Sequence, residues 1–551
     1  MKKRGILLLL LLFTLSVVLA GCSNDKQTDA NGNTNDSDGG STELTVFAPQ
    51  SSEQNLKTSW FTKQMENKFN IKFKWQTTTQ DASSASQKRQ ISLASGDLPD
   101  AYMLIPWVDQ FSTNELLKYG KQGVLIPLND LIKKYAPNIQ KTLDSNAQFK
   151  AMTVAPDGNI YGIPQLVECY HCSWPNKMYI NNDWLEKLNL KMPKTTEDFK
   201  KVLEAFKNQD PNGNGKKDEV PLSGATNIPE NSIIPFLMNG FIYDDGVKHL
   251  ILNDGKVDLV ANKPEWKEGL EYIRSLYKEG LIDPGAFTQN GDAFLKLGDN
   301  AKTEILGAAA TKHPGEFVSD QKRLYSKNYL AVPPLQGPNA DYSTYISPIA
   351  PGADFVLTQS STNADRIAAI KMMDYLFTTE GDIVGQFGKE GVDWRKPKKG
   401  EVAIEEGTEP IYATIPAKEG AKPDNNAWGA LAQYGNTKEV RNGQIQSTEV
   451  YSQEGYERRL QNLTHDYDGQ EPDNLFPFWS VWVDPSDADE VSMIETNLKS
   501  YIDQNTLKFI TGDKDLDKDW EAYVKGFDQL NLKRYLELMQ KAYDNSGKPS
   551  K

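Results

Sequence analysis

One loop of the sequence carries a closely spaced set of oxygen-bearing side chains that could bind a metal ion. Residues 210–219 read Asp-Pro-Asn-Gly-Asn-Gly-Lys-Lys-Asp-Glu, with side-chain oxygens at relative positions 1, 3, 5 and 9 and Gly215 at the sharp turn. Alternate residues of such a loop converge on one point, and Ca²⁺ prefers several oxygen ligands. An EF-hand would have a bidentate Glu at position 12, where this chain has Pro221, so Glu219 at position 10 is the available substitute. We predict a structural calcium site, with a solvated Asn-Gly turn as the alternative. The candidate ligands are Asp210, Asn212, Asn214, Asp218, Glu219 and the carbonyl oxygen of Lys216.

Cys22 follows a segment with the features of an export signal. Lys2-Lys3-Arg4 precede an apolar run over residues 6–18, which is shorter than the about 20 apolar residues of a membrane-spanning helix. The run ends at Leu-Ala-Gly-Cys22, which resembles the lipobox of bacterial lipoproteins; the resemblance implies cleavage before Cys22 and a lipid thioether on its sulfur. An ordinary signal peptide with an incidental cysteine is the alternative. We expect a signal peptide over 1–21, a polar lipidated tether over 22–42, and an extracytoplasmic protein anchored to the cell membrane by its lipid.

A third motif, Cys169-Tyr-His-Cys172, brings two thiols and an imidazole close together in sequence. A zinc site would need further ligands, which the few other His residues do not obviously supply. A thioredoxin-like role would need the motif at a helix start in a thioredoxin-type βαβ unit, and the context here differs. In an exported protein the plainer interpretation is a short-span disulfide between Cys169 and Cys172.

The composition is that of a large acidic globular protein. The 551 residues include 61 Lys and Arg against 75 Asp and Glu, for a net charge of −14. This balance argues against a nucleic-acid partner, because phosphate neutralisation needs clustered Lys and Arg. With three Cys and four His, neither a disulfide scaffold nor a multi-zinc array is possible. The length implies two or more domains.

Hydrophobic periodicity predicts strands that alternate with helices. Strand patterns, either continuous apolar runs or strict alternation, lie over 44–48, 71–75 and 101–105. Thr195-Thr-Glu-Asp198 is a signature of a helix N-terminus. Apolar stripes at helical spacing lie over 60–69, 199–206, 266–277, 367–377 and 491–502. The alternation predicts an α/β fold with mostly parallel sheets.

Short motifs over most of the chain resemble the family 1 extracellular solute-binding proteins, the carbohydrate-binding lipoproteins of ABC importers. Each motif is weak alone, but their order and spacing agree with the family. They are Ser95-Gly-Asp-Leu-Pro-Asp100, Leu125-Ile-Pro-Leu-Asn-Asp-Leu131, Asp157-Gly-Asn-Ile-Tyr-Gly-Ile-Pro164, Asn182-Asp-Trp-Leu185, Tyr277-Lys-Glu-Gly-Leu-Ile-Asp283, Phe387-Gly-Lys-Glu-Gly391 and Lys508-Phe-Ile-Thr-Gly512. The calcium loop is similar to that of the alginate-oligosaccharide-binding members, which also end it with Asp-Glu.

The resemblance implies a two-lobed periplasmic-binding-protein-like fold of type II, with an oligosaccharide held in the cleft between the lobes. It also implies ABC permease subunits as partners and a monomeric state. By analogy, lobe 1 comprises 43–165 with 329–391 returning to it. Lobe 2 comprises 166–328, with 392–551 mostly packing on it.

A carbohydrate cleft needs aromatic rings for the apolar faces of sugars and carboxylates or amides for their hydroxyls. Trp107 and Asp109 follow the strand pattern at 101–105, where α/β folds place ligand loops, and maltose-binding family members carry a Trp and an Asp in the matching loop. The same relatives carry a cleft Glu after the first crossover, which matches Glu168; a disulfide next to it would stiffen this loop. Three further tryptophans lie in Gly-, Pro- or Asn-rich segments, where ordinary burial is the alternative. The candidates are therefore Trp107, Asp109, Glu168, Trp174, Trp394 and Trp428.

Two other functions compete with a transport protein that does no covalent chemistry. An exported glycosidase or lyase is one, but the sequence has no Gly-x-Ser-x-Gly, no His-Glu-x-x-His and no phosphate loop. A pair of acids at glycosidase spacing can always be imagined among 75 carboxylates, so counting them decides nothing. An envelope scaffold that has lost its ligand is the other. We expect a binding protein and not an enzyme.

Overall fold

The computed structural model describes residues 41–226, 228–300, 303–416 and 424–546. The predicted signal peptide, Cys22 and nearly all of the predicted tether lie outside these residues. The tether was expected to extend to residue 42, but Thr42 already belongs to the first strand, where it pairs with Ile71. Within the described ranges, no helix combines the length and the apolar character that crossing a membrane requires.

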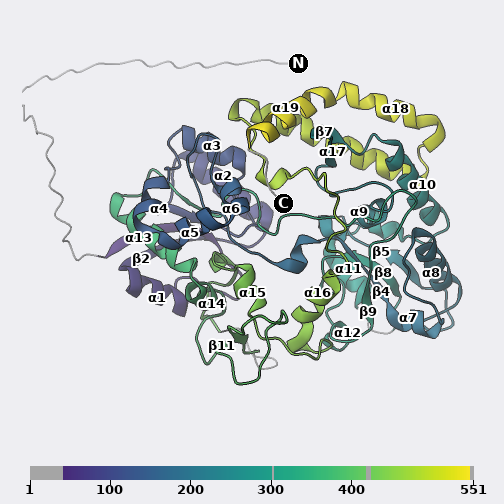
Figure 1. Cartoon of the computed structure of the whole chain (residues 1–551), viewed down its shortest axis with the longest axis horizontal. Helices are drawn as coiled ribbons and strands as arrows, with labels where there is room; N and C mark the ends of the chain where they lie inside the picture. The colour runs from purple at the N-terminus through teal and green to yellow at the C-terminus, as the bar shows by residue number, and fades with distance from the viewer. Residues whose placement is uncertain (1–40, 227, 301–302, 417–423, 547–551) are drawn as a thin grey trace, which may run out of the picture. The chain divides into compact units, whose positions relative to one another are not determined.

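The first sheet has the strand order β10-β3-β1-β2. Its strands are β1 (Thr42–Pro49), β2 (Ile71–Thr78), β3 (Ala101–Met103) and β10 (Phe355–Leu357). β1 pairs in parallel with β2 and β3, whereas β10 is antiparallel to β3. Alternate residues of a strand share a face, so Leu44 and Val46 of β1 are buried together in one core with Met373 of α13. The helices gathered around this sheet in Figure 1 are α1 (Trp60–Phe69), α2 (Ala82–Ser95), α3 (Thr113–Lys121), α4 (Asn129–Tyr135), α5 (Pro137–Ser145), α6 (Ala147–Thr153), α13 (Asn363–Leu376) and α14 (Thr379–Phe387).

The second sheet has the strand order β5-β8-β4-β9. Its strands are β4 (Lys177–Asn181), β5 (Val220–Ser223), β8 (Leu306–Thr311) and β9 (Tyr329–Val332). β8 reads Leu-Gly-Ala-Ala-Ala-Thr and is entirely buried. Gly307 has a packing role, because a Cβ there would lie 2.6 Å from the ring of Phe206 on α8. The elements associated with this sheet are α7 (Asn182–Lys187), α8 (Thr196–Asn208), α9 (Ile233–Met238), β6 (Leu250–Asn253), β7 (Lys256–Leu259), α10 (Pro264–Lys278), α11 (Gly291–Gly298) and α12 (Gln321–Leu324).

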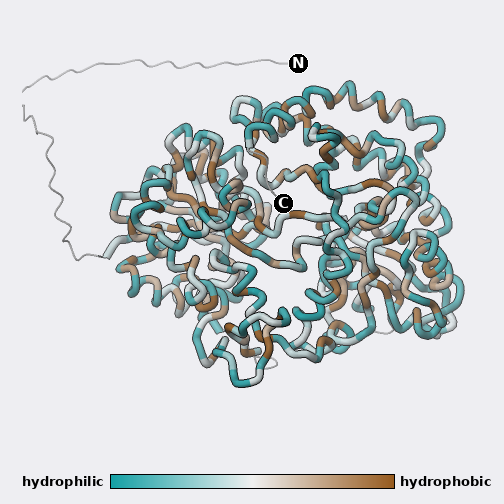
Figure 2. The backbone as a smooth tube through the Cα atoms, viewed as in Figure 1, coloured by the Kyte–Doolittle hydropathy of each residue, from teal (hydrophilic) through white to brown (hydrophobic). Residues whose placement is uncertain are grey.

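Three C-terminal helices cover the second core: α17 (Pro485–Thr511), α18 (Leu516–Gln529) and α19 (Leu532–Asn545). Val491, Ile494 and Leu498 of α17 are buried in the same cluster as Leu270 and Ile273 of α10. Hydrophilic and hydrophobic residues alternate along these helices in Figure 2, which is the pattern of helices that bury one face. The remaining elements are β11 (Trp394–Arg395), β12 (Ala413–Thr414), α15 (Lys438–Asn442), α16 (Tyr456–Thr464) and the 3₁₀ helices η1 (Tyr170–Ser173), η2 (Pro229–Asn231), η3 (Pro284–Phe287), η4 (Pro314–Glu316), η5 (Gly429–Ala432), η6 (Gln453–Gly455) and η7 (Phe478–Ser480).

The structure corrects two details of the expected organisation. The second sheet is not mostly parallel, because β4 is antiparallel to both β8 and β9 and only β5 with β8 is parallel. The chain also stays with the second sheet beyond residue 329, since β9 (Tyr329–Val332) pairs with β4, and it reaches the first core again at Tyr342. Trp428 and Tyr434, from the segment 392–551 expected to pack mostly on lobe 2, are buried in the first core.

Candidate functional site

A pocket of about 530 Å³ lies where loops that follow strands of both sheets meet. Trp107 comes from the loop after β3, and Lys312 directly follows β8. Loops at the ends of strands are where α/β folds hold their ligands. We call this the inter-sheet pocket; its walls carry the aromatic residues Trp107, Phe387 and Tyr412, the amides Gln165, Gln386, Gln433, Asn436 and Gln444, and the charged residues Lys312, Arg441 and Glu457.

The inter-sheet pocket combines one exposed indole ring with several amides. Trp107 is 64 % exposed, although large apolar side chains are usually buried. Gln165 is buried and donates from Nε2 to the carbonyl of Ala430 at 2.6 Å, while its Oε1 has no partner within the described residues. Gln433 and Asn436 both donate to Oε1 of Gln386, at 3.0 and 3.3 Å. The pocket thus offers an open indole face next to a fixed group of amides.

Glu457 of the inter-sheet pocket interacts with two neighbouring side chains. Glu457 Oε2 lies 3.3 Å from His171 Nε2 and 3.8 Å from a guanidinium nitrogen of Arg441. Burial lowers the pKa of His171 to about 4, so the imidazole is neutral at pH 7. Burial raises the pKa of Glu457, but the hydrogen bond from His171 and the charge of Arg441 outweigh this effect and lower the pKa to about 2. Glu457 is therefore a permanent carboxylate at neutral pH.

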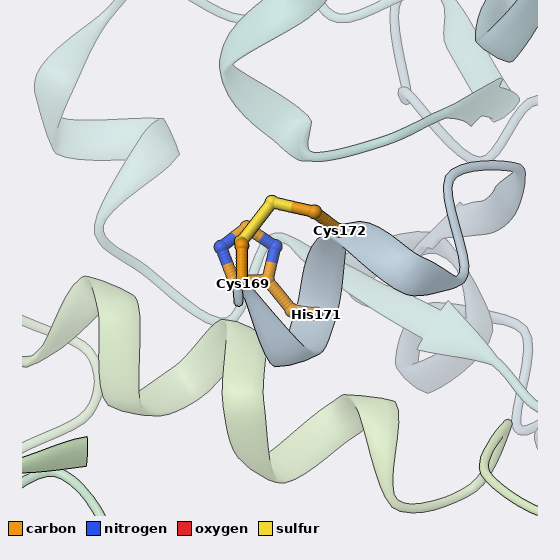
Figure 3. A group of neighbouring side chains, drawn as sticks. All are labelled: Cys169, His171 and Cys172. Carbon is orange, nitrogen blue, oxygen red and sulfur yellow. A yellow bond between two sulfur atoms is a disulfide. The ribbon is translucent and has the colours of Figure 1, made fainter. Parts of the chain in front are cut away.

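A disulfide between Cys169 and Cys172 closes the short helix η1 in the wall of the inter-sheet pocket. Figure 3 shows the imidazole of His171 beside this disulfide, on the same turn. Lys177 Nζ donates to the carbonyl of His171 at 2.7 Å and to the carbonyl of Trp174. Burial lowers the pKa of Lys177 to about 7. The turn that presents His171 is thus fixed by a covalent bond and by a buried amine.

The carboxylate of Asp109 is engaged within the protein and does not line the inter-sheet pocket. Its carboxylate accepts two hydrogen bonds from Arg89, at 2.7 and 3.0 Å, and its side chain is 6 % exposed. Arg89 also binds Glu115 at 2.9 Å, and its guanidinium lies over the ring of Phe111. A bidentate buried pair has its hydrogen-bonding capacity used within the protein, so Asp109 fixes the loop that carries Trp107.

Glu168 likewise joins parts of the protein to one another. Its Oε1 accepts from the side-chain amide of Asn146 at 3.0 Å, and its Oε2 accepts from the backbone N–H of Lys438, the first residue of α15, at 2.8 Å. The adjacent residues Val167 and Cys169 line the inter-sheet pocket. Glu168 is therefore positioned to hold the pocket wall together.

The other predicted tryptophans also lie elsewhere than in the inter-sheet pocket. Trp174 and Trp428 are 4 % and 1 % exposed and belong to the second and first cores, and the indole N–H of Trp428 donates to Thr62 Oγ1 at 2.7 Å. Trp394 lines a different hollow of about 1070 Å³ against α1 and α14. Its indole N–H donates to the carbonyl of Gly388 at 2.9 Å, and 6 % of the residue is exposed. Ordinary burial explains these residues.

The amides of the inter-sheet pocket carry no local sequence signal. Gln386 lies near the end of α14, and Gln433, Asn436 and Gln444 come from the irregular segment between η5 and α16. Single amides in such a segment are indistinguishable from ordinary loop residues. The only sequence feature that could have drawn attention to them is the presence of several Gln and Asn residues within 433–444.

The predicted calcium loop connects α8 to β5 and folds around the carboxylate of Asp210. Asp210 accepts from the backbone N–H groups of Asn214 and Gly215 at 3.2 and 3.0 Å. Asp218 accepts from the side-chain amides of Asn212 and Asn214, each at 3.0 Å.

The carboxylates of this loop fit a cation. Glu219 Oε1 is buried with no partner in the described part of the chain. Burial and the nearby charges of Asp210 and Asp218 raise the pKa of Glu219. The Oδ1 atoms of Asn212 and Asn214 accept from the backbone N–H groups of Asn214 and Lys216, at 3.0 and 2.7 Å. The side chains of the loop therefore supply a set of hard oxygens around an unsatisfied acid.

Bacterial extracellular solute-binding proteins, as a family, match residues 50–383 of this chain. The chain is also 31 % identical over 498 residues to the fructooligosaccharide ABC transporter substrate-binding protein FusA of Streptococcus pneumoniae, which covers 87 % of this chain and 86 % of FusA. The chain belongs to the bacterial extracellular solute-binding protein family. The resemblance found from the motifs is confirmed, and the family places the protein outside the cytoplasm.

Two solved structures support the fold. The S. pneumoniae FusA EF-hand mutant in complex with fructo-nystose has a TM-score of 0.68 and 27 % identity, covering 91 % of this chain and 99 % of that one. A solute-binding protein of Bifidobacterium longum infantis, described as HMO-binding and ABC-transporter-associated, has a TM-score of 0.73 and 22 % identity over 92 % of this chain and 99 % of its own. The predicted α/β, periplasmic-binding-protein-like fold is confirmed.

Proposed function

We propose that this protein is the substrate-binding component of a carbohydrate ABC importer, which captures an oligosaccharide outside the membrane and delivers it to the permease subunits. The observation that carries the proposal is the inter-sheet pocket, where the exposed ring of Trp107 lies beside buried amides such as Gln165. An indole packs on the C–H face of a sugar ring, and amides exchange hydrogen bonds with its hydroxyls. The relatives named for fructooligosaccharides and HMO support the same ligand class.

The chemistry of the inter-sheet pocket favours binding over catalysis. A glycosidase needs one protonated carboxylic acid near the scissile bond, with a raised pKa. Glu457 has the opposite property, because His171 and Arg441 lower its pKa to about 2. The relatives named above are substrate-binding proteins of transporters, which agrees with a protein that binds without turnover.

Two finer features belong to the same proposal. The loop 210–219 binds one structural Ca²⁺ through the side chains of Asp210, Asn212, Asn214, Asp218 and Glu219 and the carbonyl of Lys216; the EF-hand named in the FusA structure supports this. The lipobox at Cys22 anchors the monomeric protein to the membrane, with 22–41 as its tether.

A thermal-shift panel tests the proposal. Kestose, human milk oligosaccharides and alginate fragments are added to the calcium-saturated protein, and the supernatant is analysed for products. One class should raise the melting temperature, because a ligand at a hundredfold its Kd adds about 2.7 kcal/mol to the free energy of unfolding. The concentration of the sugar that binds should stay unchanged. Hydrolysis of any sugar would support an enzyme, and no shift with the whole panel would support a scaffold.

A further inference from the structure

Three ionisable side chains meet in the loop between α9 and β6, apart from the inter-sheet pocket and the calcium loop. Asp244, Asp245 and His249 are 0 %, 5 % and 7 % exposed. One potential ligand atom of each lies within 4.8 Å of those of the other two. The three residues form a compact buried set of two carboxylates and one imidazole.

The loop backbone holds these side chains in place. Asp245 Oδ1 accepts from the N–H groups of Val247, Lys248 and His249, at 2.8, 2.7 and 2.8 Å. Asp244 Oδ1 accepts from Gly246 N–H at 2.9 Å and lies 2.7 Å from His249 Nδ1. His249 has a φ of 56°, a left-handed conformation that a residue with a side chain adopts at a cost. The fold keeps this strained residue where its ring meets Asp244.

The set also has unused polar atoms that face a cavity. Asp244 Oδ2 and His249 Nε2 are buried and have no hydrogen-bond partner among the described residues. Both residues line a cavity of about 390 Å³, together with Trp266 and Thr506. Trp266 Nε1 and Thr506 Oγ1 are unpartnered as well. Native proteins rarely leave buried polar atoms without partners, so their concentration at one cavity indicates a bound group.

The charge of the set is incompletely balanced by the protein. Lys499, which lines the cavity, pairs with Asp503 at 2.8 Å, and Lys248 pairs with Glu495. Two adjacent buried carboxylates therefore face one imidazole. A divalent cation would supply the missing charge.

We propose that Asp244, Asp245 and His249 bind a divalent first-row transition ion of the Zn²⁺ class. Carboxylate and imidazole ligands together suit such ions, whereas Ca²⁺ prefers an all-oxygen set like that of the loop 210–219. Three protein ligands leave coordination positions open, and the cavity gives room for solvent to fill them. This site is independent of the inter-sheet pocket and of the function proposed for it.

Zinc titration of the metal-stripped full chain tests the site. The protein is first saturated with Ca²⁺ and kept oxidised, so that neither the loop 210–219 nor free thiols take up Zn²⁺, and binding is followed by calorimetry. We expect one Zn²⁺ per chain, and at least about tenfold weaker binding in His249→Gln and Asp244→Asn. The matched controls His465→Gln and Asp254→Asn should retain wild-type zinc affinity. Unchanged binding in both site variants would overturn the proposal.

A direct measurement covers the case in which the site variants fail to fold. Crystals of the wild-type protein are soaked in ZnCl₂ and measured on both sides of the zinc absorption edge. An anomalous peak within bonding distance of Asp244, Asp245 and His249 supports the site. Ordered water alone in the cavity, or a zinc peak only at other residues, contradicts it.

Discussion

Trp107 of the inter-sheet pocket is 64 % exposed, so its ring can meet a ligand from solvent. The Asp109–Arg89 pair fixes the loop that carries it. Trp107→Ala should weaken oligosaccharide binding by at least about 0.5–1.5 kcal/mol, the contribution of aromatic packing beyond area burial. The melting temperature without ligand should stay the same, because truncating an exposed side chain changes stability little. Calorimetric titration measures the affinity and a thermal melt measures the stability, with Met493→Ala, 59 % exposed on α17, as the control. Equal affinities in the two variants would count against Trp107 as a ligand contact.

Lys177 gives a pH dependence of stability whose sign can be worked out. Burial lowers its pKa from 10.5 to about 7 in the folded protein. Between these values the unfolded chain carries one more proton than the folded one, so raising the pH favours folding by at most about 1.4 kcal/mol per pH unit. The free energy of unfolding of the wild type should therefore rise from pH 7 to pH 9.5 relative to that of Lys177→Met.

Urea unfolding at several pH values measures this slope for both proteins. Lys177→Met also leaves the carbonyls of His171 and Trp174 without their donor, so its absolute stability is lower and only the difference in slope is informative. Parallel pH profiles would show that Lys177 keeps its proton when buried.

For single residues, the sequence predicted that Trp107 would lie near a pocket, but it did not predict the hydrogen-bond partners of Asp109 and Glu168. An aromatic and an acid after a buried strand predict a nearby ligand site, and Trp107 lines the inter-sheet pocket. The spacing cannot reveal that Asp109 pairs with Arg89, 20 residues earlier, or that Glu168 binds the N-terminus of α15, 270 residues later. These partners are set by tertiary packing, and so are the amides of the inter-sheet pocket.

Among the elements, the loop between α8 and β5 should depend on calcium. Removing Ca²⁺ from the saturated protein with a chelator should lower the melting temperature, because an ion at a hundredfold its Kd contributes about 2.7 kcal/mol. Asp218→Asn should abolish the response, since Asp218 is the partner of both Asn212 and Asn214. Differential scanning calorimetry is the measurement, and Asp254→Asn in the β6–β7 turn is the control. A chelator without effect on the wild type would refute the calcium assignment.

The disulfide across η1 should stabilise the protein modestly and shape the inter-sheet pocket. Replacing both Cys169 and Cys172 with Ser should cost about 2 kcal/mol, because the bond closes only a short loop. Oligosaccharide affinity should fall as well, since both residues line the pocket wall. Intact-mass spectrometry with and without reductant establishes the bond, and two free thiols in protein from an oxidising compartment would remove the premise.

Several elements could be predicted because their signals are local. The Thr195 side chain caps α8 by accepting from Asp198 N–H at 3.0 Å, as the sequence signature predicted, and the apolar stripe over 266–277 lies within α10. The pairing of β9 with β4 could not be predicted from local sequence signals. Strand order depends on contacts between residues far apart in the chain, and the antiparallel pairs of the second sheet leave no mark on the period of their side chains.

At the scale of the whole molecule, two separate cores meet at one pocket, and family membership supplies the context of transport. The central claim is that this pocket binds an oligosaccharide without altering it. Calorimetric titration with kestose, followed by chromatography of the recovered sugar, tests this most directly, with the other oligosaccharides of the panel titrated in turn. We expect saturable binding of at least one oligosaccharide, with a stoichiometry of one, loss of affinity in Trp107→Ala and full recovery of intact sugar. Cleaved sugar, or no heat of binding with any oligosaccharide of the panel, would contradict it.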